Sequence, residues 1–218
     1  MDGPTAPEER LIDCETYVVW DVETLRFSWE VPGRWSNPAG FGLAVAVSQD
    51  HLGATRTWVE ADAVELIEYL SGYDCVIGFN SRRFDNQVLE KYGDASALDD
   101  LTVDLLEDIS AAAGRPNCVS LGNLAETLLG ETKLLDDPTD AVRMWRGGKP
   151  EDRDYVVRYC RRDVELTRRA FEFGRRHGFV IIPVPDATWN DLPLVARVPV
   201  DWGQGPAGPL IAPEALDR

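Results

Sequence analysis

The sequence predicts an α/β or α+β protein in which helices flank a central sheet. Residues 16–59 contain three segments in which apolar and polar residues alternate as in strands, and helical patterns interleaved with further apolar runs follow. Of the 218 residues, 44% are hydrophobic and 28% are charged, which is typical of a folded globular protein. This length allows one full core and a tail. We therefore expect one domain over residues 1–182 and a Pro/Gly-rich extension over residues 183–218 that packs on the domain or trails it.

The first predicted elements are strands. Between the first two, residues 31–42 are rich in Pro, Gly and Trp, which favours loops or turns. A later apolar run ends in Gly78-Phe79-Asn80, and we expect it to deliver Asn80 to a loop. The predicted strands are Thr16–Val22, Phe41–Ser48, Ala54–Val59 and Cys75–Phe79.

Most of the predicted helices carry a start or a stop signal. Asp62 and Glu65 form a capping-box pattern at the first helix, Ser120 is placed to cap a later one, and Gly130 and Gly174 are expected stops. The predicted helices are Ala63–Leu70, Phe84–Tyr92, the later part of Leu101–Ala113 after a short strand, a helix between Ser120 and Gly130, and the long helix Asp152–Phe173.

Charge limits the ways in which this chain could bind nucleic acid. The net charge of −16 argues against a protein that coats nucleic acid through general basicity, because phosphate binding depends on Lys and Arg. The charge is uneven, however. Residues 151–177 contain eight arginines against six acidic residues, and Arg82 and Arg83 lie just before Asp85. Local basic patches could therefore line a site on an otherwise acidic surface.

Cysteine and histidine supply little material for a site. The cysteines lie far apart without a CxxC pair, which indicates buried free thiols and a cytoplasmic protein rather than a zinc site or a disulfide framework. With two histidines in the chain, any chemistry falls to carboxylates. No apolar run approaches the roughly 18 residues of a membrane span, so we expect no membrane association. The four cysteines are Cys14, Cys75, Cys118 and Cys160.

Two carboxylates end the first predicted strand, in the run VVWDVET at residues 18–24. Residues i and i+2 of a strand project from one face, so Asp21 and Glu23 should point the same way. Two like charges there repel each other unless a cation lies between them. The alternative is that Asp21 ends the strand at the surface and Glu23 begins a polar loop.

Two further acidic motifs lie later in the chain. In IGFNSRRFD at residues 77–85 a strand exits into a loop and Asp85 opens a helix, where it could act only as a cap. In YCRRDVELT at residues 159–167, Tyr159 and Asp163 are four residues apart and share one face of the long helix. The alternative for this pair is ordinary helix surface or a core tyrosine.

Taken in order, DxET from residue 21, NxxxFD from residue 80 and YxxxD from residue 159 resemble the three exonuclease motifs of the DEDD superfamily. The resemblance is closer still to the proofreading exonuclease domain of family B DNA polymerases and its stand-alone or helicase-fused relatives, and it covers nearly the whole chain to about residue 182. It implies a ribonuclease H-like fold, with a central mixed five-stranded sheet and helices on both sides. Arg158 stands where one subclass has a histidine, so Tyr159 indicates the tyrosine subclass.

The resemblance also implies an activity, a cofactor and roles for the acidic residues. The activity is 3′→5′ exonuclease cleavage of single-stranded DNA or RNA that releases nucleoside 5′-monophosphates. Carboxylate oxygens suit two Mg²⁺ or Mn²⁺ ions. Asp21 would bridge both ions, Glu23 and Asp163 would also bind the ion on the water side, and Asp85 would hold the second ion largely through water. Tyr159 would hydrogen-bond the attacking water or the scissile phosphate.

Other residues are candidates for substrate contacts. Trp29 and Trp35 could stack on the bases of a single strand or could instead pack in the core. Residues 133–140, KLLDDPTD, replace a Lys/Ser/Gly-Asp-Gly run of the relatives, so a nucleotide contact from this loop is not expected. The residues assigned to substrate binding are Thr24, Asn80, Arg82 and Arg83.

Two other functions remain open at this point. The chain could be a catalytically idle nucleic-acid-binding or scaffolding subunit of a helicase or repair complex, although the complete set of carboxylates disfavours this. It could also be an endonuclease or ribonuclease of the same fold. The expected partners are a single-stranded 3′ end and a separate helicase or polymerase that delivers it.

Overall fold

A five-stranded mixed sheet lies at the centre of the protein, in the order β3-β2-β1-β4-β5. The computed structural model describes residues 14–135, 137–189 and 192–203. Strand β1 pairs antiparallel with β2 and parallel with β4, while β3 and β5 form the edges. The strands are β1 (Tyr17–Thr24), β2 (Leu43–Asp50), β3 (Thr55–Val59), β4 (Cys75–Gly78) and β5 (Thr102–Asp104). This confirms the predicted mixed five-stranded sheet.

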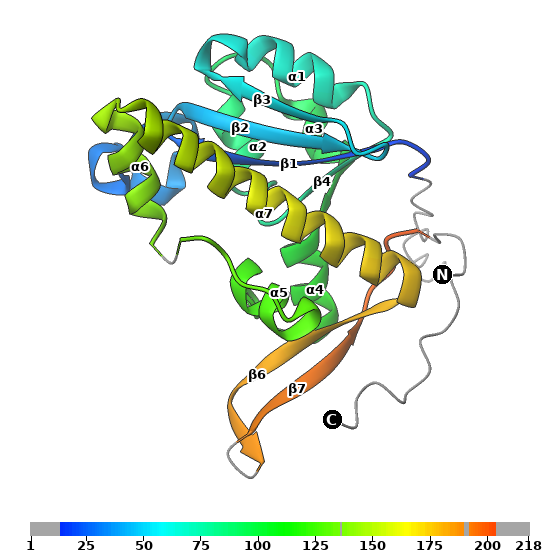
Figure 1. Ribbon diagram of the computed structural model, residues 1–218. Coiled ribbons are helices and arrows are strands. Elements are labelled where there is room, and N and C mark those ends of the chain that lie inside the picture. The colour runs from blue at the N-terminus through cyan, green and yellow to red at the C-terminus, as the bar shows by residue number, and fades with distance from the viewer. Residues whose placement is uncertain (1–13, 136, 190–191, 204–218) are drawn as a thin grey trace, which may run out of the picture.

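Helices cover both faces of the sheet (Figure 1). Successive side chains of β1 point to opposite faces of the sheet, and both faces are apolar. Val18 and Trp20 pack with Leu66 on one face, whereas Val19 packs in the cluster of Phe171 on the other. Helices α1, α2 and α3 cover the first face, and the long helix α7 crosses the second. The helices are α1 (Ala63–Ser71), α2 (Asp85–Leu89), α3 (Ser96–Leu101), α4 (Leu105–Ala113), α5 (Leu121–Leu129), α6 (Pro138–Gly147) and α7 (Pro150–His177).

Some of the predicted helix caps are present in the structure and others are not. The Ser120 hydroxyl caps α5 by accepting a hydrogen bond from the backbone N–H of Asn123 at 3.1 Å, as predicted. The capping role of Asp62 was wrong, because a 3₁₀ turn precedes α1 and the Asp62 carboxylate instead accepts the backbone N–H of Val59 at 3.0 Å. Helix α6 was not predicted, although Asp137-Pro138 is a start signal.

The predicted stop of the long helix at Gly174 was also wrong. Gly174 lies inside α7, and the helix ends at Gly178, whose φ of 71° is the left-handed conformation that suits a helix stop. Gly174 has a packing role instead. A β-carbon added there would lie 2.3 Å from the ring of Trp202, so only glycine lets this indole lie against α7.

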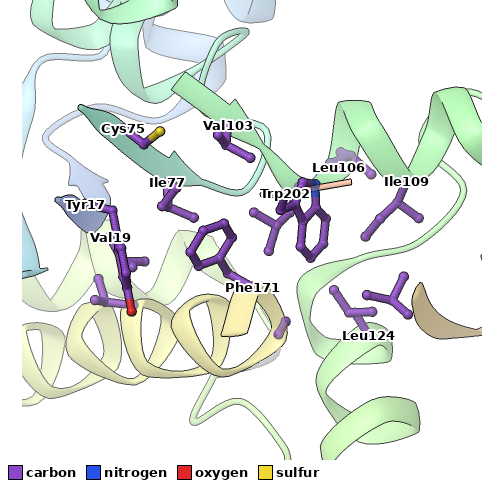
Figure 2. Close-up of a cluster of buried hydrophobic side chains, with 14 of the residues drawn as sticks. Tyr17, Val19, Cys75, Ile77, Val103, Leu106, Ile109, Leu124, Phe171 and Trp202 are labelled. Carbon is purple, nitrogen blue, oxygen red and sulfur yellow. The ribbon is translucent and has the colours of Figure 1, made fainter. Parts of the chain in front are cut away.

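The chain beyond α7 forms a hairpin rather than an irregular segment. Strands β6 (Phe179–Trp189) and β7 (Leu192–Pro199) pair antiparallel, with β6 packed on α5 and α7 and β7 on α4. The expected boundary after residue 182 therefore falls inside β6. Figure 2 shows the Trp202 indole beside Phe171 in the core, and its Nε1–H donates to the Asp108 carboxylate at 2.9 Å.

Removal of the Trp202 side chain should destabilise the whole domain. Trp202 is 1% exposed, so Trp202→Ala opens a cavity, which costs about 3–5 kcal/mol for a buried Trp. At roughly 2–4 °C per kcal/mol for a chain of this size, thermal unfolding should show a drop of about 6–20 °C. Leu194→Ala, at a 41% exposed position on β7, is the control and should melt like the wild type. An unchanged melting temperature for Trp202→Ala would show that this indole is not part of the domain core.

The cysteines depart from the expectation of four free thiols. Cys14 and Cys75 form a disulfide with their Cα atoms 5.5 Å apart, whereas Cys118 and Cys160 are free. The disulfide is a consequence of topology, because Cys75 pairs with Tyr17 across the parallel strands β1 and β4, and Cys14 lies just before β1. Within the described ranges, no helix has both the length and the apolar composition needed to cross a membrane.

Candidate metal centre and nucleic-acid cleft

The end of β1 places two carboxylates on the face of the sheet that α7 covers. Asp21 lies opposite Val47 and Glu23 opposite Val45, and the pairing with β2 shifts only after Glu23. Both residues lie within the strand, and Glu23 is only 8% exposed. The alternative of a surface strand end followed by a polar loop therefore does not hold.

Helix α7 brings the third carboxylate and the tyrosine to the same place. Asp163 and Tyr159 are both buried on the face of α7 that packs on β1 and β2. One ligand oxygen each from Asp21, Glu23 and Asp163 lie within 4.8 Å of one another. The neighbouring Cys160 fixes the position of Asp21, since its thiol donates to the Asp21 backbone carbonyl at 3.3 Å.

Asp85 joins this cluster from the first residue of α2. Its side chain does not cap the helix. Instead its carboxylate accepts the backbone N–H of Val22 at 3.2 Å, which ties it to β1 between the two acidic residues of that strand. The pKa of Asp85 is raised to about 7, mainly by burial and also by repulsion from Asp104 and Asp163. Hydrogen bonds from backbone N–H groups act in the opposite direction and lower it.

The cluster is electrostatically costly without a cation. Burial raises the pKa of Asp21 well above its usual value, and repulsion from Asp85, Asp163 and Glu23 raises it further. The pKa of Glu23 is raised in the same way, first by burial and then by Asp163. Carboxylates that are brought together at partly or fully buried positions and repel one another are the arrangement that a multivalent cation stabilises most.

Lys133 supplies one positive charge to the cluster, a role that no sequence motif predicted. Its ammonium lies 2.5 Å from the Asp163 carboxylate and 5.2 Å from the centre of the Tyr159 ring. Burial alone would lower the pKa of Lys133, but Asp163, Asp21 and Glu23 together raise it, so the ammonium stays charged. Lys133 lies in the loop after α5, where no periodic pattern predicts the direction of a side chain.

The donor set fits a hard divalent cation. All four groups are carboxylates, which Mg²⁺ and Mn²⁺ prefer over nitrogen or sulfur ligands. The Oδ1 atom of Asp163 is buried without a hydrogen-bond partner, because Lys133 contacts only the other oxygen, Oδ2. A buried carboxylate oxygen without a donor is costly, and a metal ion would satisfy it.

The carboxylates open into a cleft of about 850 Å³. Thr24, Asn80 and Arg83 line this cleft together with the acidic cluster and Tyr159. Asn80 adopts a φ of 66°, and its loop is held by Asp104, whose carboxylate accepts the backbone N–H of Asn80 at 2.8 Å.

Arg82 differs from the other candidate substrate residues. Its guanidinium donates to the backbone carbonyls of Asp99 and Thr102 and pairs with the carboxylate of Glu107 at 3.0 Å, so it holds the loop after β4. The arginines of α7 that were expected to form a basic patch are largely engaged as well. Arg162, for example, pairs with Glu131 at 2.7 Å. The positive charges that line the cleft come from Arg26, Arg83 and Lys133.

Divalent metal should raise the melting temperature, and the rise should depend on pH. A cation that binds the folded state at 100 times its dissociation constant adds about 2.7 kcal/mol, or about 5–10 °C for this chain. A carboxyl group whose pKa is higher in the folded state than in the unfolded state stabilises the metal-free fold when it is protonated. For Asp85 this stabilisation is fully present below the unfolded pKa of 3.8 and is lost as the pH rises through the folded pKa of about 7. The metal-free protein should therefore lose stability over that window.

The shift produced by Mn²⁺ should accordingly be larger at about pH 8 than at about pH 5, where bound protons compete with the metal. Thermal melts with chelator and with millimolar Mn²⁺ at both pH values measure this. An equal shift at the two pH values, or no shift, would contradict metal binding at the cluster.

Comparisons with known proteins agree with this fold. Residues 44–172 match the family model of the RNase H superfamily. The family B DNA polymerase from the hyperthermophilic archaeon Pyrobaculum calidifontis aligns with 73% of the chain at 15% identity and a TM-score of 0.55. An ExoI/SSB-Ct complex and a structure of exonuclease I align with 76% and 74% of the chain at 15% and 14% identity, each with a TM-score of 0.35. No curated protein matches the sequence.

The chain spans only part of these proteins, namely 24% of the polymerase and 45% and 44% of the two exonuclease chains. The likeness to the polymerase shows a shared fold, which agrees with the ribonuclease H-like fold implied by the three sequence motifs. The family match covers more than half of the chain and includes strands β2 to β5 and most of α7. The chain therefore belongs to the RNase H superfamily.

Proposed function

We propose that this protein is a divalent-metal-dependent 3′→5′ exonuclease that removes nucleoside 5′-monophosphates from single-stranded DNA or RNA. The observation that carries the proposal is the convergence of four carboxylates, the half-buried Asp21 and the buried Glu23, Asp85 and Asp163, with Tyr159 in one open cleft. The superfamily fold supports a nuclease, and the buried acidic cluster supports dependence on metal. The polarity, the release of mononucleotides and the number of ions are the finer parts of the proposal.

Asp21, Glu23, Asp85 and Asp163 would hold the metal. Asp21 has a ligand oxygen within 4.8 Å of those of Glu23 and Asp163, and Asp85 also raises its pKa, so we assign Asp21 as the ligand that two ions would share. Two bound Mg²⁺ or Mn²⁺ ions would supply an activated water and would stabilise the charge on the scissile phosphate and the leaving oxygen. The protein in turn limits the access of bulk water to Glu23, Asp85 and Asp163, which are buried.

Tyr159 and Lys133 act on the same reaction through polar contacts. Burial and the neighbouring Asp163 carboxylate raise the pKa of Tyr159, so its hydroxyl stays protonated and can donate a hydrogen bond to the attacking water or to the phosphate. The Lys133 ammonium lies beside the Tyr159 ring and can offset negative charge on the phosphate.

The substrate side of the cleft is formed by Thr24, Asn80 and Arg83. Arg83 has an exposed side chain at 61% and a long contact of 3.4 Å with Glu107, so it is free to turn toward a phosphate. We assign Arg82 to the support of this loop rather than to the substrate, because each nitrogen of its guanidinium already donates to an internal partner. A separate helicase or polymerase would deliver the single strand.

The test uses single-stranded DNA and RNA labelled at the 5′ end, incubated with Mg²⁺, with Mn²⁺ or with chelator. A 3′→5′ exonuclease produces a ladder that shortens toward the label, releases mononucleotides and needs metal. A strand blocked at its 3′ end should resist. Internal cuts in the blocked strand would show an endonuclease, and the absence of cleavage under all conditions would contradict the proposal.

One observation favours a second candidate, a catalytically idle nucleic-acid-binding subunit. The ion pair between Lys133 and Asp163 already compensates part of the cluster's charge without a metal. An idle subunit would bind single strands in chelator, show no metal-dependent melting shift and cleave nothing. The orphaned oxygen of Asp163 argues against it, since Lys133 leaves this atom unsatisfied.

A further inference from the structure

Two exposed tryptophans lie beside the catalytic cleft. Trp29 is 60% exposed and Trp35 is 66% exposed, and they are the only exposed aromatic side chains among those whose burial the structure describes. The alternative that they pack in the core is therefore wrong. They lie on consecutive 3₁₀ turns, Ser28–Glu30 and Arg34–Ser36, in the segment that joins β1 to β2. This segment begins directly after the metal-binding end of β1.

Trp35 is part of the wall of the cleft itself. Its ring lies 5.2 Å from the ring of Phe41 and 5.8 Å from that of Phe84, and all three residues line the cleft. Phe84 directly precedes Asp85, so this aromatic wall adjoins the acidic cluster. Phe41 is 2% exposed and anchors the wall, while the indole of Trp35 remains open to a ligand.

Trp29 packs on a neighbouring ring although it is exposed. Its indole stacks on the ring of Phe27 with centroids 4.4 Å apart and planes 6° apart, and Phe27 lines the cleft. The guanidinium of Arg146 lies 5.4 Å from the Phe27 ring and also pairs with Glu30 at 2.7 Å, which connects this turn to α6. One face of the indole is thus covered by Phe27.

Two arginines in the cleft can contact the phosphates of a nucleic acid. Arg26 and Arg83 line the same cleft as the proposed metal ligands. Flat aromatic faces combined with arginines are the means by which proteins bind single strands without regard to sequence, because every base has a face that can stack. A double strand does not offer its base faces in this way.

We propose that Trp29 and Trp35 form a base-stacking platform that holds the unpaired bases next to the 3′ end of a single strand in the cleft. This inference rests on the proposed nuclease function, since it concerns the substrate of the same site. It adds that the protein selects single strands through stacked bases rather than through base-specific hydrogen bonds.

Binding can be measured without hydrolysis, which separates this inference from the catalytic one. The probe is a short oligothymidine with fluorescein at its 5′ end, titrated in chelator and followed by fluorescence anisotropy. Trp35→Ala should raise the dissociation constant roughly 5- to 150-fold, which corresponds to about 1–3 kcal/mol for one stacked base. Trp29→Ala should weaken binding in the same direction. Trp35→Phe keeps a ring and should stay close to the wild type.

An abasic probe, in which the last three nucleotides lack bases, tests whether stacking is responsible. The wild type should bind it more weakly than the normal probe by a factor at least as large as that of Trp35→Ala, and Trp35→Ala should lose part of this difference between the two probes. Leu52→Ala, at an 82% exposed position in the β2–β3 turn outside the cleft, is the control and should change nothing. Thermal melts of each variant show that it is folded.

Equal affinity of the wild type for the normal and abasic probes, or no binding at all, would overturn the platform. These outcomes differ from a failure of the proposed function. Base-dependent binding without metal-dependent cleavage would leave the platform intact and refute the nuclease. Metal-dependent cleavage together with equal binding of the normal and abasic probes would support the nuclease and refute the platform.

Discussion

Asp21→Asn should abolish cleavage, with a loss of at least about 1,000-fold in rate. Asp21 lies at the centre of the carboxylate cluster, and its pKa is raised by all three of the other acidic groups. Loss of a group that only supports a metal ligand typically costs 10- to 100-fold, so loss of a shared ligand should cost more. The variant should nevertheless melt at the same temperature as the wild type or higher in chelator, because one source of repulsion is gone.

The matched control for Asp21→Asn is Glu15→Gln. Glu15 is an exposed acidic residue just before the other end of β1, so its loss changes net charge equally without touching the cluster. Initial rates on a labelled single strand, with enzyme purified to exclude contaminating nucleases, measure both variants. Cleavage by Asp21→Asn at a tenth of the wild-type rate or faster would defeat the assignment of the site.

Tyr159→Phe should lower the catalytic rate about 10- to 100-fold with little change in metal affinity. One positioned hydrogen bond in the transition state can supply an effect of this size. The phenylalanine ring keeps the packing against Val45 and Val156, so the fold should not change. Metal affinity, taken from the dependence of the melting temperature on Mn²⁺ concentration, should be preserved because the carboxylates are untouched.

Tyr73→Phe is the control for the tyrosine. It lies between α1 and β4, and its hydroxyl donates to the Tyr69 hydroxyl at 2.8 Å, outside the cleft lining. Loss of that hydroxyl should leave the rate unchanged. Turnover of Tyr159→Phe within twofold of the wild type at saturating Mn²⁺ would mean that the Tyr159 hydroxyl is idle, while the role of the four carboxylates would stand.

Local periodicity explains what the sequence could predict about the site. The strand period places Asp21 and Glu23 on one face, and the helix period places Tyr159 and Asp163 on one face, without knowledge of the fold. That the two faces meet is a matter of topology. It followed from the resemblance of the three motifs to a family, not from any local rule.

Several features that the sequence did not predict depend on tertiary contacts. Lys133 reaches the cluster because of the path of a loop, and Cys14 meets Cys75 because β1 and β4 are parallel neighbours. Glycine occurs both at helix ends and where another side chain packs closely against a helix, and the sequence alone does not distinguish these roles. The position of Trp202 shows that Gly174 has the second role. The hairpin β6–β7 was not predicted because its segment contains several prolines, which are more common in loops than in strands.

A crystal structure with Mn²⁺ tests most directly whether these carboxylates bind two divalent cations. The anomalous signal of manganese locates the ions independently of the protein. We predict two peaks in the cleft, with Asp21 contacting both, Glu23 and Asp163 contacting one, and Asp85 near the other. The absence of any peak at millimolar Mn²⁺, with the Lys133 ammonium as the only cation at Asp163, would contradict the account.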